Sequence, residues 1–308
     1  MIGAVTGLDF RPAMSTYAFR LLNVFAPSTF GGNPLCVFED ARGLDEQTML
    51  DLARQFNLSE TTFVLPSERA DARVRIYTPG YEMRFAGHPT LGTAHVVREL
   101  AGTGDRLALE FAAGVVPVQA QGDTWTFTAP AAGAPKTARP ALPAAEIAAQ
   151  LGLGVDDLLE EPMWVDTGAD QLLVPLKTPE AVGRAQPDSG RLQHWQPSSL
   201  GRKTAYVFAF DPAPGPDGRQ AVRARYFFTK DGGGVAEDPG TGSACANLGG
   251  WLIARNRPRP ARVLVEQGDQ VGRPCRLYLD VAADGAIRVG GAVIELGRGT
   301  VRIPRPAA

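Results

Sequence analysis

The first part of the chain carries short runs in which apolar and polar residues alternate, as expected of half-buried strands. Residues 43–58, "GLDEQTMLDLARQFNL", instead place apolar side chains three and four positions apart behind acidic residues, which predicts an amphipathic helix. A second helical stripe starts behind the "GHP" of residues 87–89. The predicted strands of this part cover residues 17–26, 34–40, 59–66, 72–79, 106–112, 114–122 and 123–130.

The second part of the chain repeats this order of elements. A glycine-rich turn runs into an apolar helix within residues 237–256. Aligning Gly87 with Gly242 places "GHPTLGTAHVV" over "GSACANLGGWL", and an arginine-containing aromatic strand precedes both segments. We therefore expect two similar halves. The predicted strands of the second part cover residues 171–176, 204–210, 222–229, 261–268, 275–281 and 286–296.

This order of elements predicts an α+β fold with two pseudo-symmetric domains. A lone helix and a one-sided sheet each have an apolar face to bury, so we expect a curved, mostly antiparallel sheet wrapped around a central helix in each domain. The expected boundaries are an N-terminal extension at 1–15, a first domain at 16–130 and a second at 131–308, whose last strand is free to return to the first. The Ala/Pro-rich stretch 129–144 is the predicted linker.

Composition narrows the classes of protein to consider. The chain has 308 residues, is 44% hydrophobic and has a net charge of −2 with interspersed charges, so we expect a globular protein that binds neither nucleic acid nor membranes. The first residues lack the basic segment of a signal peptide. Cys36, Cys245 and Cys275 are odd in number and widely spaced, which predicts neither disulfides nor a zinc site and suggests the cytoplasm.

His88 stands where the helix behind "GHP" should begin. Unpaired backbone N–H groups make such an end an anion site, and in a pseudo-twofold arrangement both helix ends would face one cleft. A small carboxylate substrate could then be held by the backbone of residues in both turns, without a metal ion. The alternative is an ordinary helix start with an incidental histidine. The expected backbone donors are Gly87, His88, Gly242, Ser243 and Ala244.

Five ordered blocks between about residue 16 and about residue 300 make the chain similar to the PhzF family. They are "GGNPLCVF", "NLSETTFV", "TPGYEMRFAGHPTLGTAHVV", "EDPGTGSACANLGGWL" and "EQGDQVGRPC". These proteins are isomerases of phenazine biosynthesis and their relatives, and they share the fold of diaminopimelate epimerase. The resemblance implies a cofactor-independent isomerase that forms a homodimer. We also assign Asn33, from the first block, to substrate binding.

The same resemblance assigns the catalytic acid/base to Glu60, in "LSET". Taken alone, Glu60 could be a strand carboxylate on a solvent face. Inside an apolar cleft, however, desolvation would raise its pKa toward neutrality, where a carboxyl group can both take and return a proton.

The resemblance also places His88, Asp238 and Ser243 in the active site. His88 could relay a proton or hydrogen-bond the substrate. Asp238 could bind a substrate amine or hydroxyl, pair with His88 to set its tautomer, or merely cap a helix. Ser243 could cap the helix and also donate its hydroxyl to the bound carboxylate.

Several neighbouring residues limit the chemistry. Ala86 and Pro239 precede the two glycine turns, where related epimerases carry two cysteines, so a two-thiol racemase is disfavoured. His95 lies seven positions after His88, which is the wrong spacing for a chelating pair and predicts a packing role. Arg84 could be a charge at the rim of the site that changes substrate preference, or a solvated strand residue, which we favour.

The function predicted from these residues is proton transfer within a small carboxylic acid of the dihydro-hydroxyanthranilate type. Glu60 would remove a proton from an activated carbon and return it to another carbon, without metal or cofactor. Two alternatives stay open. One is a racemase or epimerase of an amino-acid-like substrate that pairs Glu60 with a non-thiol partner, and the other is a non-catalytic protein that binds small carboxylates.

Overall fold

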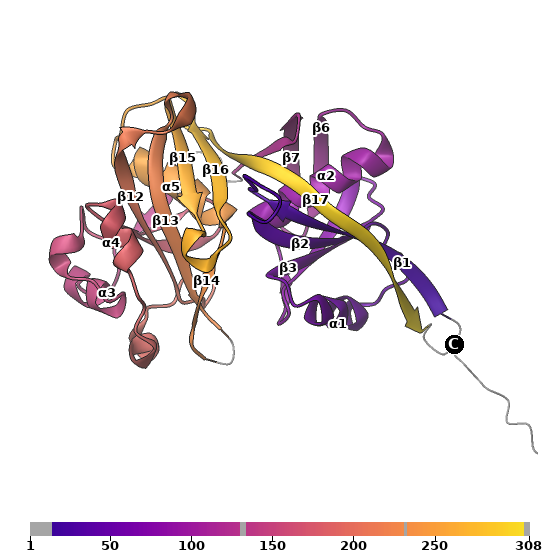
Figure 1. Cartoon of the computed structure of the whole chain (residues 1–308), viewed down its shortest axis with the longest axis horizontal. Coiled ribbons are helices and arrows are strands. Elements are labelled where there is room, and N and C mark those ends of the chain that lie inside the picture. The colour runs from indigo at the N-terminus through magenta and orange to yellow at the C-terminus, as the bar shows by residue number, and fades with distance from the viewer. Residues whose placement is uncertain (1–13, 130–133, 231–232, 305–308) are drawn as a thin grey trace, which may run out of the picture.

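The computed structural model describes residues 14–129, 134–230 and 233–304, which form two lobes side by side (Figure 1). The elements of the N-terminal half are β1 (Met14–Val24), β2 (Asn33–Phe38), α1 (Glu46–Phe56), β3 (Glu60–Leu65), β4 (Ala72–Tyr77), β5 (Glu82–Met83), α2 (Gly87–Ala101), β6 (Arg106–Phe111), β7 (Gly114–Gln121) and β8 (Thr124–Thr128).

The C-terminal half has the same sequence of strands and helices, with additional short elements at its start and in its loops. These elements are β9 (Lys136–Ala138), α3 (Ala144–Gln150), η1 (Val155–Asp157), β10 (Met163–Asp166), β11 (Asp170–Pro175), α4 (Pro179–Arg184), η2 (Ser189–His194), β12 (Thr204–Pro214), η3 (Pro216–Gly218), β13 (Gln220–Thr229), β14 (Val235–Asp238), α5 (Gly242–Ala254), β15 (Ala261–Gln267), η4 (Asp269–Val271), β16 (Cys275–Val281) and β17 (Ile287–Pro304).

The N-terminal half is a closed barrel around α2. Pairing runs through β1, β2, β3, β4, β6, β7, β8 and β17 and then back to β1. Only the β2–β3 and β4–β6 pairs are parallel. The helix α2 fills this barrel, and it is buried on all sides from Gly87 to Ala94.

The C-terminal half repeats this pattern without closing. Its sheet runs from β9 through β10, β11, β12, β13, β15 and β16 to β17, and the β11–β12 and β13–β15 pairs are parallel, as are their counterparts in the first half. The sheet wraps α5, whose mean hydropathy suits a fully buried helix. The parallel pairs recur at equivalent places, which supports the predicted relation between the halves.

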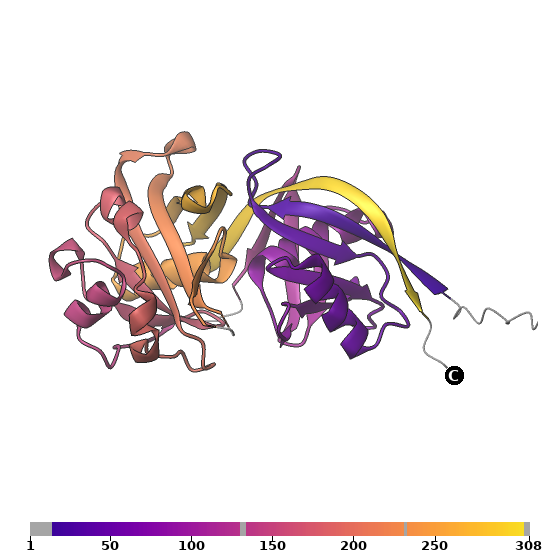
Figure 2. The same cartoon turned by 60° about the horizontal axis from the view of Figure 1, so that its bottom comes forward.

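The strand β17 joins the two halves. Residues 288–290 pair with β16 on one side and with β8 on the other, and residues 293–304 continue along β1. In Figure 2 this strand leaves the second lobe and curves over the first. The last strand therefore returns to the first half, and its hydrogen bonds join the sheet of the second half to the barrel of the first.

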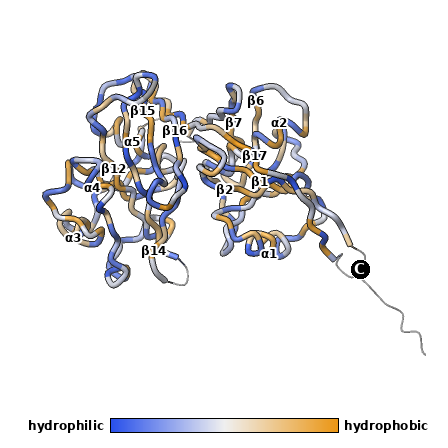
Figure 3. The backbone as a smooth tube through the Cα atoms, viewed as in Figure 1, coloured by the Kyte–Doolittle hydropathy of each residue, from blue (hydrophilic) through white to orange (hydrophobic). Residues whose placement is uncertain are grey.

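The core follows the sheets and the two central helices. Apolar residues run along them, and hydrophilic residues gather on the loops (Figure 3). One buried cluster extends from Leu22 and Phe127 in the first half to Trp251 and Leu279 in the second. The two helices therefore lie against a continuous apolar interior, which fixes where their N-termini can meet.

The structure confirms the α+β fold class with a sheet wrapped around a helix in each half. The predicted linker differs in detail, because β9 pairs with β10 and α3 begins at Ala144. Residues 130–133, where the predicted boundary between the domains falls, lie outside the described residues. So does the predicted extension up to residue 13, whereas Met14 and Ser15 belong to β1. None of the helices described is long and apolar enough to cross a membrane.

Candidate active site

The N-termini of α2 and α5 touch each other where the halves meet. A Cβ atom on Gly87 would lie 3.1 Å from the Cα atom of Gly242, and a Cβ atom on Gly242 would lie 3.3 Å from the Cα atom of Gly87. Both distances are shorter than an ordinary van der Waals contact between two carbon atoms, so any side chain at either position would crowd the opposite helix. Glycine at both positions therefore allows the two helix ends to converge.

Both helix ends retain free backbone donors. The first helical residue of α2 follows Ala86 and that of α5 follows Thr241, and neither residue caps its helix through a side chain within the described parts of the chain. The backbone N–H groups of Gly87 and His88, and those of Gly242, Ser243 and Ala244, precede the first intrahelical bonds. Two partial positive charges thus converge at one point, which favours an anionic group there.

Glu60 is the first residue of β3, and the end of α1 places it there. Asn57 closes that helix in the left-handed conformation with φ of 51°, and its N–H donates to the carbonyl of Ala53. The chain then turns into β3, in which Glu60 pairs with Leu35 of β2. The carboxyl group consequently stands at the end of a buried strand, with its side chain 15% exposed.

Glu60 and His88 form the central pair of the site. The Nε2 atom of His88 lies 3.4 Å from the Oε2 atom of Glu60, and the histidine side chain is only 6% exposed. Neither atom makes a hydrogen bond to any residue that the structure describes. The other ring nitrogen of His88, Nδ1, is hydrogen-bonded to the backbone of Pro34, which has no N–H and can only accept. Donation by Nδ1 leaves the Nε2 lone pair facing Glu60.

Burial shifts the pKa values of this pair in opposite directions. Desolvation and, to a smaller extent, the nearby carboxylate of Asp238 raise the pKa of Glu60 to about 8, against the opposing positive charge of Arg202. Desolvation lowers the pKa of His88 to about 3. Near neutral pH the proton of the pair therefore resides on Glu60, and the imidazole is neutral.

Asp238 is held by side chains from both halves of the molecule. Asn33 Nδ2 donates to Asp238 Oδ1 at 2.9 Å and to the carbonyl of Gly240 at 3.0 Å, and the hydroxyl of Thr241 donates to Asp238 Oδ2. Ser59 donates to Asn33 Oδ1 at 3.4 Å. Burial raises the pKa of Asp238, although these donors lower it. Asn33 thus positions Asp238, and its predicted contact with substrate stays a prediction.

Asp238 and Ser243 are not the side-chain caps of α5. The residue that precedes this helix is Thr241, and Asp238 accepts the hydroxyl of Thr241 without bonding to a helix N–H in the described chain. Ser243 is the second residue of the helix, and its Oγ atom accepts a hydrogen bond of 2.9 Å from Gln171. Ala244, the next predicted backbone donor, is fully buried. The side chains of Asp238 and Ser243 are therefore available for roles other than capping.

Arg202 reaches from the second half to the first beside this pair. Its guanidinium carbon lies 5.4 Å from the ring centroid of Tyr81, which belongs to the turn before β5. The same positive charge acts on Glu60 and on Tyr226. No carboxylate within the described ranges pairs with Arg202 at salt-bridge distance. The site therefore contains a cation that no motif of the sequence indicates.

The remaining candidates lie outside this group. His95 accepts a hydrogen bond of 3.4 Å from Trp125 Nε1, so it packs in the barrel as predicted. The side chain of Arg84 is exposed. The three cysteines are buried and free, and burial raises the pKa of each thiol, which disfavours thiolate chemistry. In the ranges described, no group of three His, Cys, Asp or Glu side chains is arranged to hold a metal ion.

Sequence reasoning missed the polar side chains behind the site. Gln267 donates to the carbonyl of Asp238 at 2.8 Å and to Thr241 Oγ1 at 3.0 Å, and Gln171 holds Ser243. Both glutamines are nearly inaccessible and stand at the end of an apolar strand. The one sequence signal for these residues is a glutamine next to an apolar strand segment, because a buried side-chain amide needs hydrogen-bond partners.

Comparisons with known proteins agree with this fold. The family model described as "Phenazine biosynthesis-like protein" (PhzC-PhzF) matches residues 22–297. The chain is 37% identical over 293 residues to an uncharacterized isomerase of Pasteurella multocida, with 94% of this chain and 96% of that protein covered.

Two further matches have more specific names. The chain is 35% identical over 292 residues to trans-2,3-dihydro-3-hydroxyanthranilate isomerase of Pseudomonas aeruginosa, with coverage of 92% and 96%. The crystal structure of a Bacillus anthracis phenazine biosynthesis protein of the PhzF family matches with a TM-score of 0.79 at 25% identity and covers 93% of this chain and 99% of its own. The chain therefore belongs to the phenazine biosynthesis-like protein family, and it is an isomerase.

Proposed function

We propose that this isomerase moves a proton between two carbons of a small carboxylic acid, with Glu60 as the acid/base and without metal or cofactor. The observation that carries the proposal is the buried carboxyl group of Glu60, whose Oε2 atom makes no hydrogen bond within the described chain and faces His88 at 3.4 Å. The name of the Pseudomonas aeruginosa relative supports a dihydro-hydroxyanthranilate-like substrate class.

The proposed cycle begins with Glu60 ionised. A carbon–hydrogen bond of the substrate breaks, its proton goes to the carboxylate, and the electron pair delocalises into the adjacent unsaturated system. The same carboxyl group then gives the proton to a different carbon, so Glu60 is regenerated and the product is an isomer. A pKa near 8 makes both steps accessible near neutral pH, because neither form of the carboxyl group is strongly favoured.

The converging helix ends supply the proposed anion site. Backbone N–H groups of Gly87 and Gly242, and those of the residues that follow them, would hold the substrate carboxylate and oppose the negative charge that develops during proton transfer. These donors are preorganised by the helices and need no rearrangement during the reaction. Asp238 would then accept a hydrogen bond from a substrate amine or hydroxyl.

The pseudo-symmetry supports a single base. Where the first half has His88 after its glycine, the second half has Ser243 after Gly242, and Ser243 is bonded to the neutral side chain of Gln171. A racemase needs a proton acceptor on one face of the carbon and a donor on the other. The position equivalent to His88 holds a hydroxyl, which is a far weaker base than an imidazole or a carboxylate, so the arrangement favours transfer on one face by Glu60.

The test is deuterium incorporation from heavy water, followed by NMR, with trans-2,3-dihydro-3-hydroxyanthranilate as substrate. We expect the wild-type protein, dialysed against a chelator, to form the isomer and to place deuterium on one carbon. The Glu60→Gln variant should lower the rate at least about 1,000-fold, because the amide keeps the shape but cannot take a proton. Glu180→Gln, on the separate helix α4, is the matched control and should leave the rate unchanged.

Each other outcome assigns a different function. Exchange that survives in Glu60→Gln would exclude Glu60 as the base. Inversion at one stereocentre of an amino-acid-like substrate would identify a racemase. Tight binding of carboxylates without any exchange would identify a binding protein that has lost turnover.

A further inference from the structure

We propose that Gln171 and Asn247 are positioning residues that fix Ser243 as a hydrogen-bond donor toward the substrate anion. The inference deepens the proposed function, because it rests on the substrate carboxylate binding at the N-terminus of α5. It concerns the direction of each hydrogen bond in a buried chain of amides that ends at the site.

The direction is set at the far end of the chain, at Asn247. The backbone N–H of Thr167 donates to Asn247 Oδ1 at 2.9 Å, and the hydroxyl of Thr167 donates to the same atom at 2.7 Å. Asn247 Nδ2 donates to the carbonyl of Ala169 at 2.8 Å. A backbone N–H can only donate and a carbonyl can only accept, so the amide of Asn247 has one possible orientation.

The orientation of the Asn247 amide in turn fixes the orientation of the Gln171 amide. Asn247 Nδ2 donates to Gln171 Oε1 at 2.8 Å, which makes that oxygen the acceptor. The nitrogen of Gln171 must then face the other way, and it donates to Ser243 Oγ at 2.9 Å and to the hydroxyl of Tyr226 at 3.4 Å. Asn247 is fully buried and Gln171 is 5% exposed, so water does not compete for these bonds.

The fixed orientation of Gln171 determines the hydrogen bonding of the Ser243 hydroxyl. Its oxygen accepts from Gln171, which leaves its own proton to be donated elsewhere. No residue in the described parts of the chain accepts that proton, and Ser243 itself is half-buried at the start of α5. The hydroxyl therefore adds a donor to the backbone N–H groups at the converging helix ends, where a carboxylate is expected.

A double-mutant cycle tests this assignment through the split between KM and kcat. The substrate carboxylate stays anionic throughout the reaction, so a hydrogen bond to it stabilises the bound substrate and the transition state equally. Loss of that bond therefore raises KM and leaves kcat unchanged. We expect Ser243→Ala to raise the KM for trans-2,3-dihydro-3-hydroxyanthranilate roughly 10- to 100-fold and Gln171→Met to raise it roughly tenfold. Added to Ser243→Ala, Gln171→Met should change KM by no more than about twofold, because Gln171 acts only through the hydroxyl.

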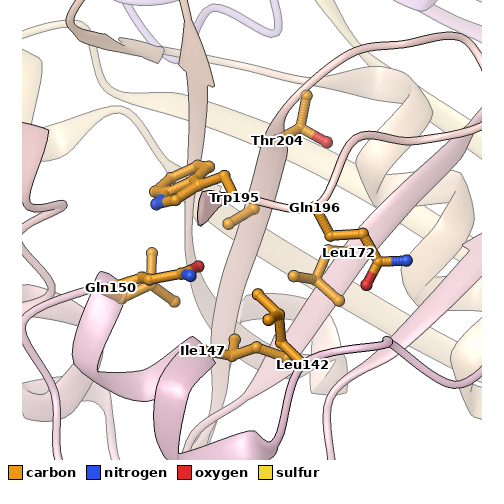
Figure 4. A pocket seen from close by; sticks show the side chains of 9 residues that line it. Leu142, Ile147, Gln150, Leu172, Trp195, Gln196 and Thr204 are labelled. Atoms are coloured by element: carbon orange, nitrogen blue, oxygen red, sulfur yellow. The ribbon is translucent and has the colours of Figure 1, made fainter. Parts of the chain in front are cut away.

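A nearly isosteric variant tests the direction of the bond. Gln171→Glu introduces an acceptor where the nitrogen was, so the hydroxyl of Ser243 would turn toward it and stop donating to the substrate. We expect its KM to reach that of Ser243→Ala. Gln150→Glu is the matched control, because Gln150 is a buried glutamine of the same half that lines a separate small cavity beside Trp195 (Figure 4). It should leave KM unchanged.

Additive effects of Gln171→Met and Ser243→Ala would overturn the proposal, as would a fall in kcat with KM unchanged. If no turnover is found, the proposed function fails separately. The same cycle is then measured as the dissociation constant of the unreactive analogue 3-hydroxyanthranilate.

A readout without any ligand completes the test. In a 1H–15N spectrum of glutamine-labelled protein, the side-chain signal lost in Gln171→Met identifies Gln171. That signal should move in Ser243→Ala and stay in place in the matched control Ser67→Ala, on the other half. A signal that does not respond to Ser243→Ala would contradict the bond itself.

Discussion

At the scale of single residues, the site depends on where one proton resides. Glu60 and His88 face each other at 3.4 Å, and burial favours the neutral form of both. The protonated carboxyl group and the neutral imidazole therefore form a pair without net charge, which is the cheaper state in a buried site. Arg202 opposes this effect from the other half by favouring the ionised carboxylate.

The charge of Arg202 gives a prediction about pH. If ionised Glu60 is the base, kcat/KM should rise with pH and level off above about pH 8, where the carboxylate dominates. Arg202→Gln removes a charge that lowers this pKa, so the rising limb should move to higher pH and kcat/KM at pH 7 should fall roughly two- to fivefold. The exposed Arg84→Gln is the matched control. A limb that stays in place or moves to lower pH would show that Arg202 does not act on Glu60.

At the scale of elements, two glycines allow the helix ends to meet. The Cα atom of Gly242 and the ring of Phe127 both lie 3.1 Å from where a Cβ atom on Gly87 would be. A backbone atom cannot turn aside as a flexible side chain can. A larger residue at position 87 would therefore have to displace α5 from α2 or distort the barrel.

Gly87→Ala should consequently impair both stability and turnover. We expect a loss of about 1–3 kcal/mol in the free energy of unfolding, the usual cost of overpacking, together with weaker binding of the carboxylate. Gly183→Ala is the matched control, because Gly183 lies in helix α4 with only ordinary contacts around the added Cβ atom. It should stabilise the protein by up to about 1 kcal/mol. Urea denaturation and ligand titration measure both quantities, and equal behaviour of the two variants would refute the steric argument.

At the scale of the whole molecule, β17 ties the halves together, and Arg20 anchors its far part. Arg20 lies on β1 with a side chain only 2% exposed. It donates to Glu39 and Glu99 at 2.6 Å each and to Glu295 of β17 at 3.0 Å. One buried guanidinium thus holds together the carboxylates of a strand end, a helix and the returning strand.

Arg20→Met should weaken the molecule as a whole. Removing the cation takes the ion pair from Glu39 and leaves Glu99 and Glu295 with only the exposed Arg298, and we expect the free energy of unfolding to fall by roughly 2–4 kcal/mol. Because β17 pairs with both halves, the urea transition should shift as a single step. Arg42→Met removes an ion pair with Asp40 at the surface and should not move the midpoint. Two separate transitions would show that the strand does not couple the halves.

The sequence indicated the fold class, the order of most strands and of the two central helices, and which residues to examine for chemistry, whereas short elements such as α3, α4, β10 and β14 were not predicted. Alternation and helical spacing are local properties of a chain, and the repeated glycine turns are enough to indicate two similar halves. The residues Glu60, His88, Asp238 and Ser243 were identified by their motifs, and the structure brings Glu60 and His88 into contact.

The connections between these residues arise from tertiary packing. Asn33 meets Asp238 across 205 positions of sequence, and Gln171 meets Ser243 across 72. The sequence could not show the charge of Arg202 beside Glu60 or the orientation of the amides behind Ser243. Burial, hydrogen-bond direction and the electrostatic field at a site depend on which distant segments pack together, and no local pattern of residues records that packing.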